Sequence, residues 1–139
     1  MNAFDTDVLT EIFAGDAVLR ARLDEIDADK RGIPIVAASE IVRGWLNLIR
    51  QAESGKARTP PDVAFLRLQQ SLVNMAPLAL LPYTAAAHTI VEGWKAAKIR
   101  VGTNDMRIAA ICIDYGATLV TRSARDYAQL PGLTFDVWN

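Results

Sequence analysis

The chain has 139 residues, of which 51% are hydrophobic, and a formal net charge of −1. This length suits one compact core and is too short for two ordinary domains, so we expect a single domain over residues 1–139. The near-neutral charge and the lack of an apolar run of membrane-spanning length exclude a disordered chain, a basic arm and a membrane protein. The single cysteine, Cys112, excludes a disulfide framework and a cysteine-rich zinc site. The first residues include no basic region, so we expect no signal peptide and a cytoplasmic location.

The N-terminal residues predict a short strand followed by a helix. Residues 2–7 alternate weakly in hydrophobicity, and we expect this strand to deliver Asp5 at its carboxyl end. Thr6 or Asp7 can then cap a helix that ends at Gly15.

The next elements continue the alternation of strands and helices. Asp16 is expected to cap a second helix. The apolar run 33–37 predicts a second strand, and Ser39 is expected to cap a helix with Glu40 in its first turn. Residues 62–74 predict an amphipathic helix. The remaining predicted elements are a strand at 77–81, helices at about 84–98 and 104–115, a turn at Gly116 and strands at 118–121 and 133–135.

This alternation is typical of a three-layer α/β/α fold with a mostly parallel central sheet. Such sheets bind ligands at the carboxyl ends of their strands. Asp5 and Glu40 follow the first and second predicted strands, and Asp126 follows the strand at 118–121. We therefore expect these acids to meet at one edge of the sheet.

A fourth acid, Asp105, opens the helix that precedes the 118–121 strand. Ile108, Cys112 and Tyr115 continue its apolar stripe at helical spacing, so Asp105 is expected on the buried face. Taken alone, an acid at this position can simply favour the helix dipole. Its convergence with three other acids instead indicates a functional cluster.

Grouped carboxylates repel one another unless a cation neutralises them. Magnesium and manganese prefer hard oxygen ligands, and carboxylate-bound ions support hydrolysis of phosphodiesters without a histidine or cysteine nucleophile. The pattern therefore favours metal-dependent phosphodiester hydrolysis.

Four segments together resemble the successive motifs of PIN-domain ribonucleases, and most closely the VapC toxins of type II toxin–antitoxin pairs. These segments are FDTDVL at 4–9, SEIVRG at 39–44, NDMRIAAICIDYGATLVTRSARDY at 104–127 and PGLTFDVW at 131–138. The resemblance implies a PIN-like fold and metal-dependent endoribonuclease activity on RNA. It also implies a homodimer and a cognate antitoxin that inserts a C-terminal segment into the site.

The resemblance also assigns roles to individual residues. It implies a site for Mg²⁺ or Mn²⁺ formed by Asp5, Glu40, Asp105 and Asp126. Small polar residues of the family line this site at the positions of Thr121 and Ser123, where Ser123 replaces a frequent Asn. Asp7 stands where many relatives have Asn, as a further metal or water contact or as a helix cap. The arginines beside these motifs are candidates for contacts with RNA phosphates or antitoxin carboxylates: Arg43, Arg107, Arg122 and Arg125.

Three other functions remain open at this point. The pair Asp5 and Asp7 resembles the DxD motif of haloacid-dehalogenase-type phosphatases, but no lysine follows a strand near the acids. A receiver domain would need a phospho-acceptor Asp after a central strand and a lysine after the last strand. A PIN-fold protein that binds or processes RNA without a toxin role is the third alternative. Among the aromatic residues, Trp45 is expected in the core, whereas Trp94 and Trp138 are candidates for a partner surface.

Overall fold

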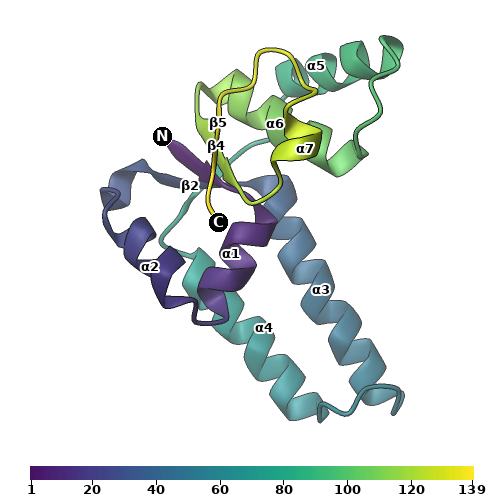
Figure 1. The fold of residues 1–139 in the computed structure, drawn as a ribbon. Helices are drawn as coiled ribbons and strands as arrows, with labels where there is room; N and C mark the ends of the chain where they lie inside the picture. The colour runs from purple at the N-terminus through teal and green to yellow at the C-terminus, as the bar shows by residue number, and fades with distance from the viewer.

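The computed structural model describes residues 1–139 and confirms an α/β fold with a parallel sheet flanked by helices (Figure 1). The five strands lie in the order β3-β2-β1-β4-β5, and every neighbouring pair is parallel. The strands are β1 (Asn2–Phe4), β2 (Arg31–Pro34), β3 (Ala79–Leu81), β4 (Thr118–Thr121) and β5 (Phe135–Val137). The helices are α1 (Thr6–Phe13), α2 (Ala17–Asp24), the 3-10 turn η1 (Ala28–Lys30), α3 (Ile35–Glu53), α4 (Pro61–Met75), α5 (Ala85–Ala96), α6 (Thr103–Tyr115) and the short α7 (Ala124–Tyr127).

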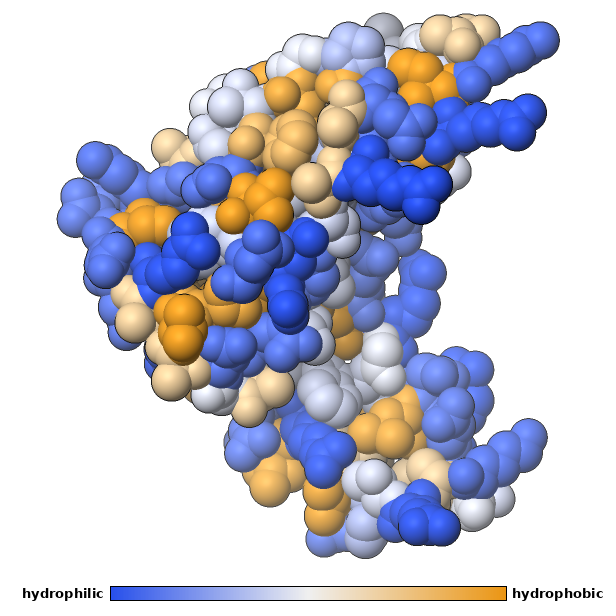
Figure 2. Space-filling view, viewed as in Figure 1, coloured by the Kyte–Doolittle hydropathy of each residue, from blue (hydrophilic) through white to orange (hydrophobic).

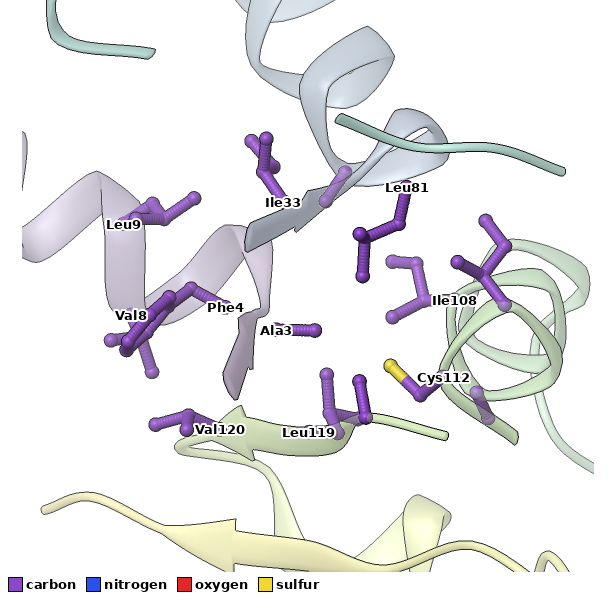
Figure 3. Packing of buried hydrophobic residues seen from close by; sticks show 14 of the residues in the cluster. Ala3, Phe4, Val8, Leu9, Ile33, Leu81, Ile108, Cys112, Leu119 and Val120 are labelled. Atoms are coloured by element: carbon purple, nitrogen blue, oxygen red, sulfur yellow. The ribbon is translucent and has the colours of Figure 1, made fainter. Parts of the chain in front are cut away.

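The first strand of the chain, β1, lies at the centre of the sheet. Its two apolar residues, Ala3 and Phe4, are fully buried and point to opposite faces, as the alternation of a strand requires (Figure 3). Helix α6 covers one face, with Ile108 and Cys112 directed toward the strands, and α1 covers the other through Val8. The sheet is thus the middle of three layers.

Helices α3 and α4 form a long hairpin that extends away from the sheet (Figure 1). A small apolar cluster of Ile49, Ala52 and Ala64 joins them, and the Trp45 indole N–H donates to the Ser71 hydroxyl at 2.6 Å. The apolar residues Phe65, Leu66 and Leu72 of α4 are about half exposed (51%, 50% and 49%). The amphipathic helix is therefore confirmed, but part of its apolar surface faces solvent. Met75 is the residue of α4 that reaches the main core, and Ala64 packs in the smaller cluster with Ile49 and Ala52 of α3.

The predicted boundary after the second strand was wrong. Strand β2 ends at Pro34 and α3 begins at Ile35, so most of the apolar run 33–37 is the first turn of a helix. Ser39 does not cap this helix, because its hydroxyl donates to the Val36 carbonyl inside it at 2.7 Å. Glu40 consequently lies in the second turn of α3 and not in the first.

Several smaller predictions also need correction. Asp5, and not Thr6 or Asp7, caps α1. Tyr115 is 49% exposed because it ends α6 beside the left-handed Gly116, beyond the sheet. Trp94 and Trp138 are buried and therefore not free to form a partner surface. No helix combines the length and apolar character needed to cross a membrane.

Candidate active site

Asp5 lies at the carboxyl end of β1 and is only 5% exposed. Its backbone continues the sheet, because its N–H donates to the Val120 carbonyl at 2.9 Å. One carboxylate oxygen accepts from the Thr6 N–H and the other from the Thr121 hydroxyl, both at 2.8 Å. Burial, followed by repulsion from the Asp7 carboxylate, raises the pKa of Asp5 from 3.8 to about 6. The sheet therefore holds a rigid carboxylate in a position where its negative charge is destabilised.

Asp105 lies in the first turn of α6, and its side chain is half-buried. The helix is anchored by Ile108 and Cys112, both fully buried, and burial of an isoleucine side chain such as Ile108 contributes about 1.5–3 kcal/mol. The Tyr127 hydroxyl donates to Asp105 Oδ1 at 3.3 Å. Burial raises the pKa of Asp105, and the carboxylates of Glu40 and Asp126 raise it further. Asp105 therefore lies within the electrostatic field of both of these acids.

Glu40 reaches the cluster from the second turn of α3. The Thr6 hydroxyl donates to Glu40 Oε1 at 3.0 Å, which ties α3 to the start of α1. Asp126 lies in α7, is half-buried and raises the pKa of Asp105 through repulsion. The structure thus brings the predicted acids to the same edge of the sheet from separate segments of the chain.

Asp7 holds the loop between β4 and α7. Its carboxylate accepts from the Arg122 N–H at 3.1 Å and from the Ser123 hydroxyl at 2.9 Å. It also lies 3.4 Å from the Thr121 hydroxyl, which acts as donor. Asp7 is therefore no helix cap: it fastens the segment that leads to Asp126 onto α1.

The cluster has no compensating positive side chain. The ion pairs of the structure are Lys30–Asp27, His88–Glu92, Lys95–Glu92 and Arg122–Glu11, and none includes an acid of the site. No group of three or more His, Cys, Asp or Glu side chains forms a ready-made metal cage. The residues nevertheless suit a hydrated Mg²⁺ or Mn²⁺ in chemistry and charge, because all donors are hard carboxylate oxygens and the carboxylates repel one another.

The four candidate arginines differ in their surroundings. Arg122 pairs with Glu11 at 3.4 Å, and Arg107 donates to the Asn104 side chain at 3.1 Å. Arg43 and Arg125 are exposed and form no ion pair. Arg43 and Arg125 are therefore the arginines most available to an anionic ligand, because they are both exposed and unpaired.

The surface around the cluster is concave. The molecule is hollowed between the part formed by α5, α6 and α7 and the α3–α4 hairpin (Figure 2). Two grooves run along α3 and α4, and both include Glu40. One is lined by residues that include Arg43, Leu72 and Leu80, and the other by residues that include Thr6, Trp45 and Arg67. An extended ligand in either groove would reach the edge of the acidic cluster.

These features define a parallel α/β protein with an acidic cluster at the carboxyl edge of its sheet. Residues 3–132 match the PIN domain family, and the chain belongs to that family. This membership confirms the resemblance found in the sequence and leaves the phosphatase and receiver alternatives without support.

One curated relative is Ribonuclease VapC1 of Rickettsia felis, which is 32% identical over 71 residues. The aligned part is 51% of this chain and 52% of that protein, so the chain spans about half the length of the curated relative it matches.

Solved structures share the whole fold. VapBC2 from Rickettsia felis, bound to a DNA fragment from its promoter, has a TM-score of 0.76 at 16% identity, over 99% of this chain and 98% of that chain. DNA-bound VapBC from Salmonella typhimurium has a TM-score of 0.76 at 17% identity, with the same coverage of 99% and 98%. FitAcB from Neisseria gonorrhoeae has a TM-score of 0.72 at 19% identity, over 98% and 97%. At these low sequence identities, the structural similarity establishes the fold alone.

Two residues at the cluster have no counterpart among the sequence-based candidates. Thr6 donates to Glu40, and Tyr127 donates to Asp105. Thr6 was expected only as a helix cap. For Tyr127, the available signal was its position directly after Asp126, but only the fold reveals that its hydroxyl is buried against a carboxylate.

Proposed function

We propose that this chain is a VapC-like endoribonuclease, the toxin of a toxin–antitoxin pair, acting as one domain on cytoplasmic RNA. The observation that carries the proposal is the group of uncompensated carboxylates at the carboxyl edge of a PIN-family sheet: Asp5, Glu40, Asp105 and Asp126. The name of the VapC1 relative, a ribonuclease, supports the same substrate.

In this proposal, Asp5, Asp105 and Asp126 hold Mg²⁺ or Mn²⁺ directly or through water, and Glu40 completes the set. Such an ion, when bound, activates water and neutralises charge that develops on the phosphodiester. Asp5 supplies the most rigid oxygens because backbone and hydroxyl donors fix its carboxylate. Glu40 is less buried, and the Thr6 hydroxyl holds one of its oxygens, so the other is available to orient an attacking water.

The surrounding residues position the ligands and the substrate. Thr121 fixes Asp5. Ser123 donates to Asp7, so the loop between β4 and α7, which leads to Asp126, is held against α1. The exposed Arg43 and Arg125 are our candidates for contacts with RNA phosphates, with Arg107 and Arg122 in supporting positions.

We further propose a cognate antitoxin and a homodimer as protein partners. The similar structures include VapBC2 from Rickettsia felis, FitAB and a toxin–antitoxin complex from Klebsiella pneumoniae. The exposed apolar side chains of α4, together with the grooves along α3, supply surface for such contacts. An antitoxin segment that ends near Glu40 would block the cluster. A PIN-fold RNA-binding protein without a toxin role remains the alternative, because fold and carboxylates would be the same.

The test is cleavage of RNA by the purified protein with Mg²⁺, with Mn²⁺ and with EDTA. We expect cleavage only with metal, and a loss of roughly 100-fold or more in Asp5→Asn and Asp105→Asn, since a bound ion contributes several kcal/mol of transition-state stabilisation. Asp24→Asn, at an exposed position of α2, is the matched control and should cleave normally. Equal cleavage in EDTA would sink the metal-dependent mechanism. Growth arrest on expression of the wild type, absent for Asp5→Asn, separates the toxin from the RNA-processing alternative.

A further inference from the structure

The Tyr127 hydroxyl is an unusual feature of the acidic cluster because it belongs to an otherwise buried aromatic ring. Tyr127 ends α7 and is 1% exposed. Its hydroxyl donates to Asp105 Oδ1 at 3.3 Å. A phenylalanine would fill the same space without a polar atom, so packing alone does not account for the hydroxyl.

The bond from Tyr127 is the one side-chain hydrogen bond that the Asp105 carboxylate accepts. Asp105 is half-buried, so this neutral hydroxyl donor is what fixes its carboxylate within the cluster.

Tyr127 connects the segments that carry the acids. It follows Asp126 directly in α7, and its hydroxyl contacts Asp105 of α6. A helix of four residues has few contacts of its own, so the buried Tyr127 is the anchor that fixes α7.

We propose that Tyr127 is a positioning residue whose hydroxyl holds the Asp105 carboxylate in place, so that Asp105 and the adjacent Asp126 are presented to one divalent cation. This inference rests on the proposed function, because it concerns the metal that function requires. Outer-sphere hydrogen bonds of this kind orient metal ligands, and their loss typically weakens metal binding by about 10–100-fold.

The experiment compares Tyr127→Phe with the wild type in Mn²⁺ binding, measured by calorimetry and by the Mn²⁺ electron paramagnetic resonance signal. We expect binding about 10-fold weaker or more in Tyr127→Phe. RNA cleavage should fall at low Mn²⁺ and recover toward the wild-type rate at saturating Mn²⁺. Tyr115→Phe, an exposed tyrosine at the end of α6, is the matched control and should bind Mn²⁺ as the wild type does.

A second measurement, the unfolding midpoint in EDTA, tests the hydrogen bond without any bound metal. In EDTA, the shift in unfolding midpoint caused by Tyr127→Phe should be clearly smaller in an Asp105→Asn background, because the two changes remove the same charged hydrogen bond. Wild-type Mn²⁺ affinity in Tyr127→Phe, or fully additive shifts in EDTA, would overturn the positioning role while leaving the proposed function intact. If the wild-type protein binds no Mn²⁺, both the positioning role of Tyr127 and the proposed metal-dependent function are overturned.

Discussion

Replacement of Asp5 by Asn should stabilise the metal-free protein at neutral pH, although it should abolish cleavage. Asn has nearly the same shape, and its side-chain oxygen can still accept from the Thr6 N–H that Asp5 caps at 2.8 Å. In the wild type the Thr121 hydroxyl donates to Asp5 at 2.8 Å. In the variant the Asn amide can donate to this hydroxyl, and the hydroxyl can donate to the Asp7 carboxylate, which already lies within its reach. The substitution therefore removes a buried negative charge with little other change.

The size of the effect follows from the pKa of Asp5, which is raised from 3.8 to about 6. For an acid with a raised pKa, the folded protein holds the proton more tightly than the unfolded chain does, so stability is lost as pH rises between these two values. One pKa unit corresponds to about 1.4 kcal/mol, so ionised Asp5 lowers the free energy of unfolding by on the order of 3 kcal/mol above about pH 6. Asn does not titrate and avoids this loss.

The assay is urea denaturation in EDTA at about pH 4 and about pH 7.5, with Asp24→Asn as the control that carries the same chemical change on the surface. We expect Asp5→Asn to exceed the wild type by up to about 3 kcal/mol at the higher pH and to gain much less at the lower pH. Saturating Mn²⁺ should reduce or reverse this difference in the free energy of unfolding, because a ligand at 100 times its Kd stabilises the wild type by about 2.7 kcal/mol. A variant less stable than the wild type at pH 7.5, or a gain independent of pH, would refute this electrostatic reasoning.

Two further substitutions test how the site is supported. Asp7→Ala removes the acceptor of the Arg122 N–H and the Ser123 hydroxyl, so we expect a loss of about 1–3 kcal/mol in urea denaturation and weaker RNA cleavage, whereas Asp24→Ala should change neither. Gly116→Ala places a side chain at φ +79°, so we expect a loss of about 1–2 kcal/mol with normal cleavage by the folded protein; an unchanged urea midpoint would contradict the strain at this turn.

Much of the fold could be predicted because its signals are local. The strand at 118–121 is confirmed residue for residue, and the preceding helix differs from its prediction by one residue. Gly116 adopts the left-handed conformation expected of a glycine that ends a helix. Asp16 caps α2 through a bond from the Leu19 N–H at 3.0 Å, as predicted.

Several failed predictions share one physical cause, which is that apolar character in the sequence specifies neither the kind of backbone nor which apolar side chains the fold covers. The run 33–37 is apolar throughout although Ile35 at the start of α3 is 39% exposed, so neither hydrophobicity nor periodicity locates the boundary between β2 and α3. Phe65 and Leu72 of α4 have the spacing of core residues, yet they are about half exposed, and Met75 is the residue of α4 that reaches the main core. Trp138 is buried at 4% exposure although it is next to the last residue, because it packs on Phe4 and under Arg22.

The positions of the candidate acids could be predicted, but their connections could not. Asp5 and Asp105 stand out by their place beside buried elements. The hydroxyl bonds from Thr6 and Tyr127 depend on side-chain directions that no sequence spacing determines. The role of Asp7 as a brace for the β4–α7 loop likewise becomes visible only when α1 and that loop lie side by side.

The central position of β1 has a consequence for the order of events during synthesis. The chain's first strand pairs with β4, and Asp5 is bonded to Thr121, 116 residues later. The acid at the start of the chain is therefore without its support until residue 121 and the segment after it have been made and have closed the sheet. Such distant pairing is intrinsically late in folding. A nascent chain that already exposes Asp5 and Glu40 thus lacks the assembled cluster, and the activity proposed for this protein would begin only after the C-terminal strands have joined the sheet.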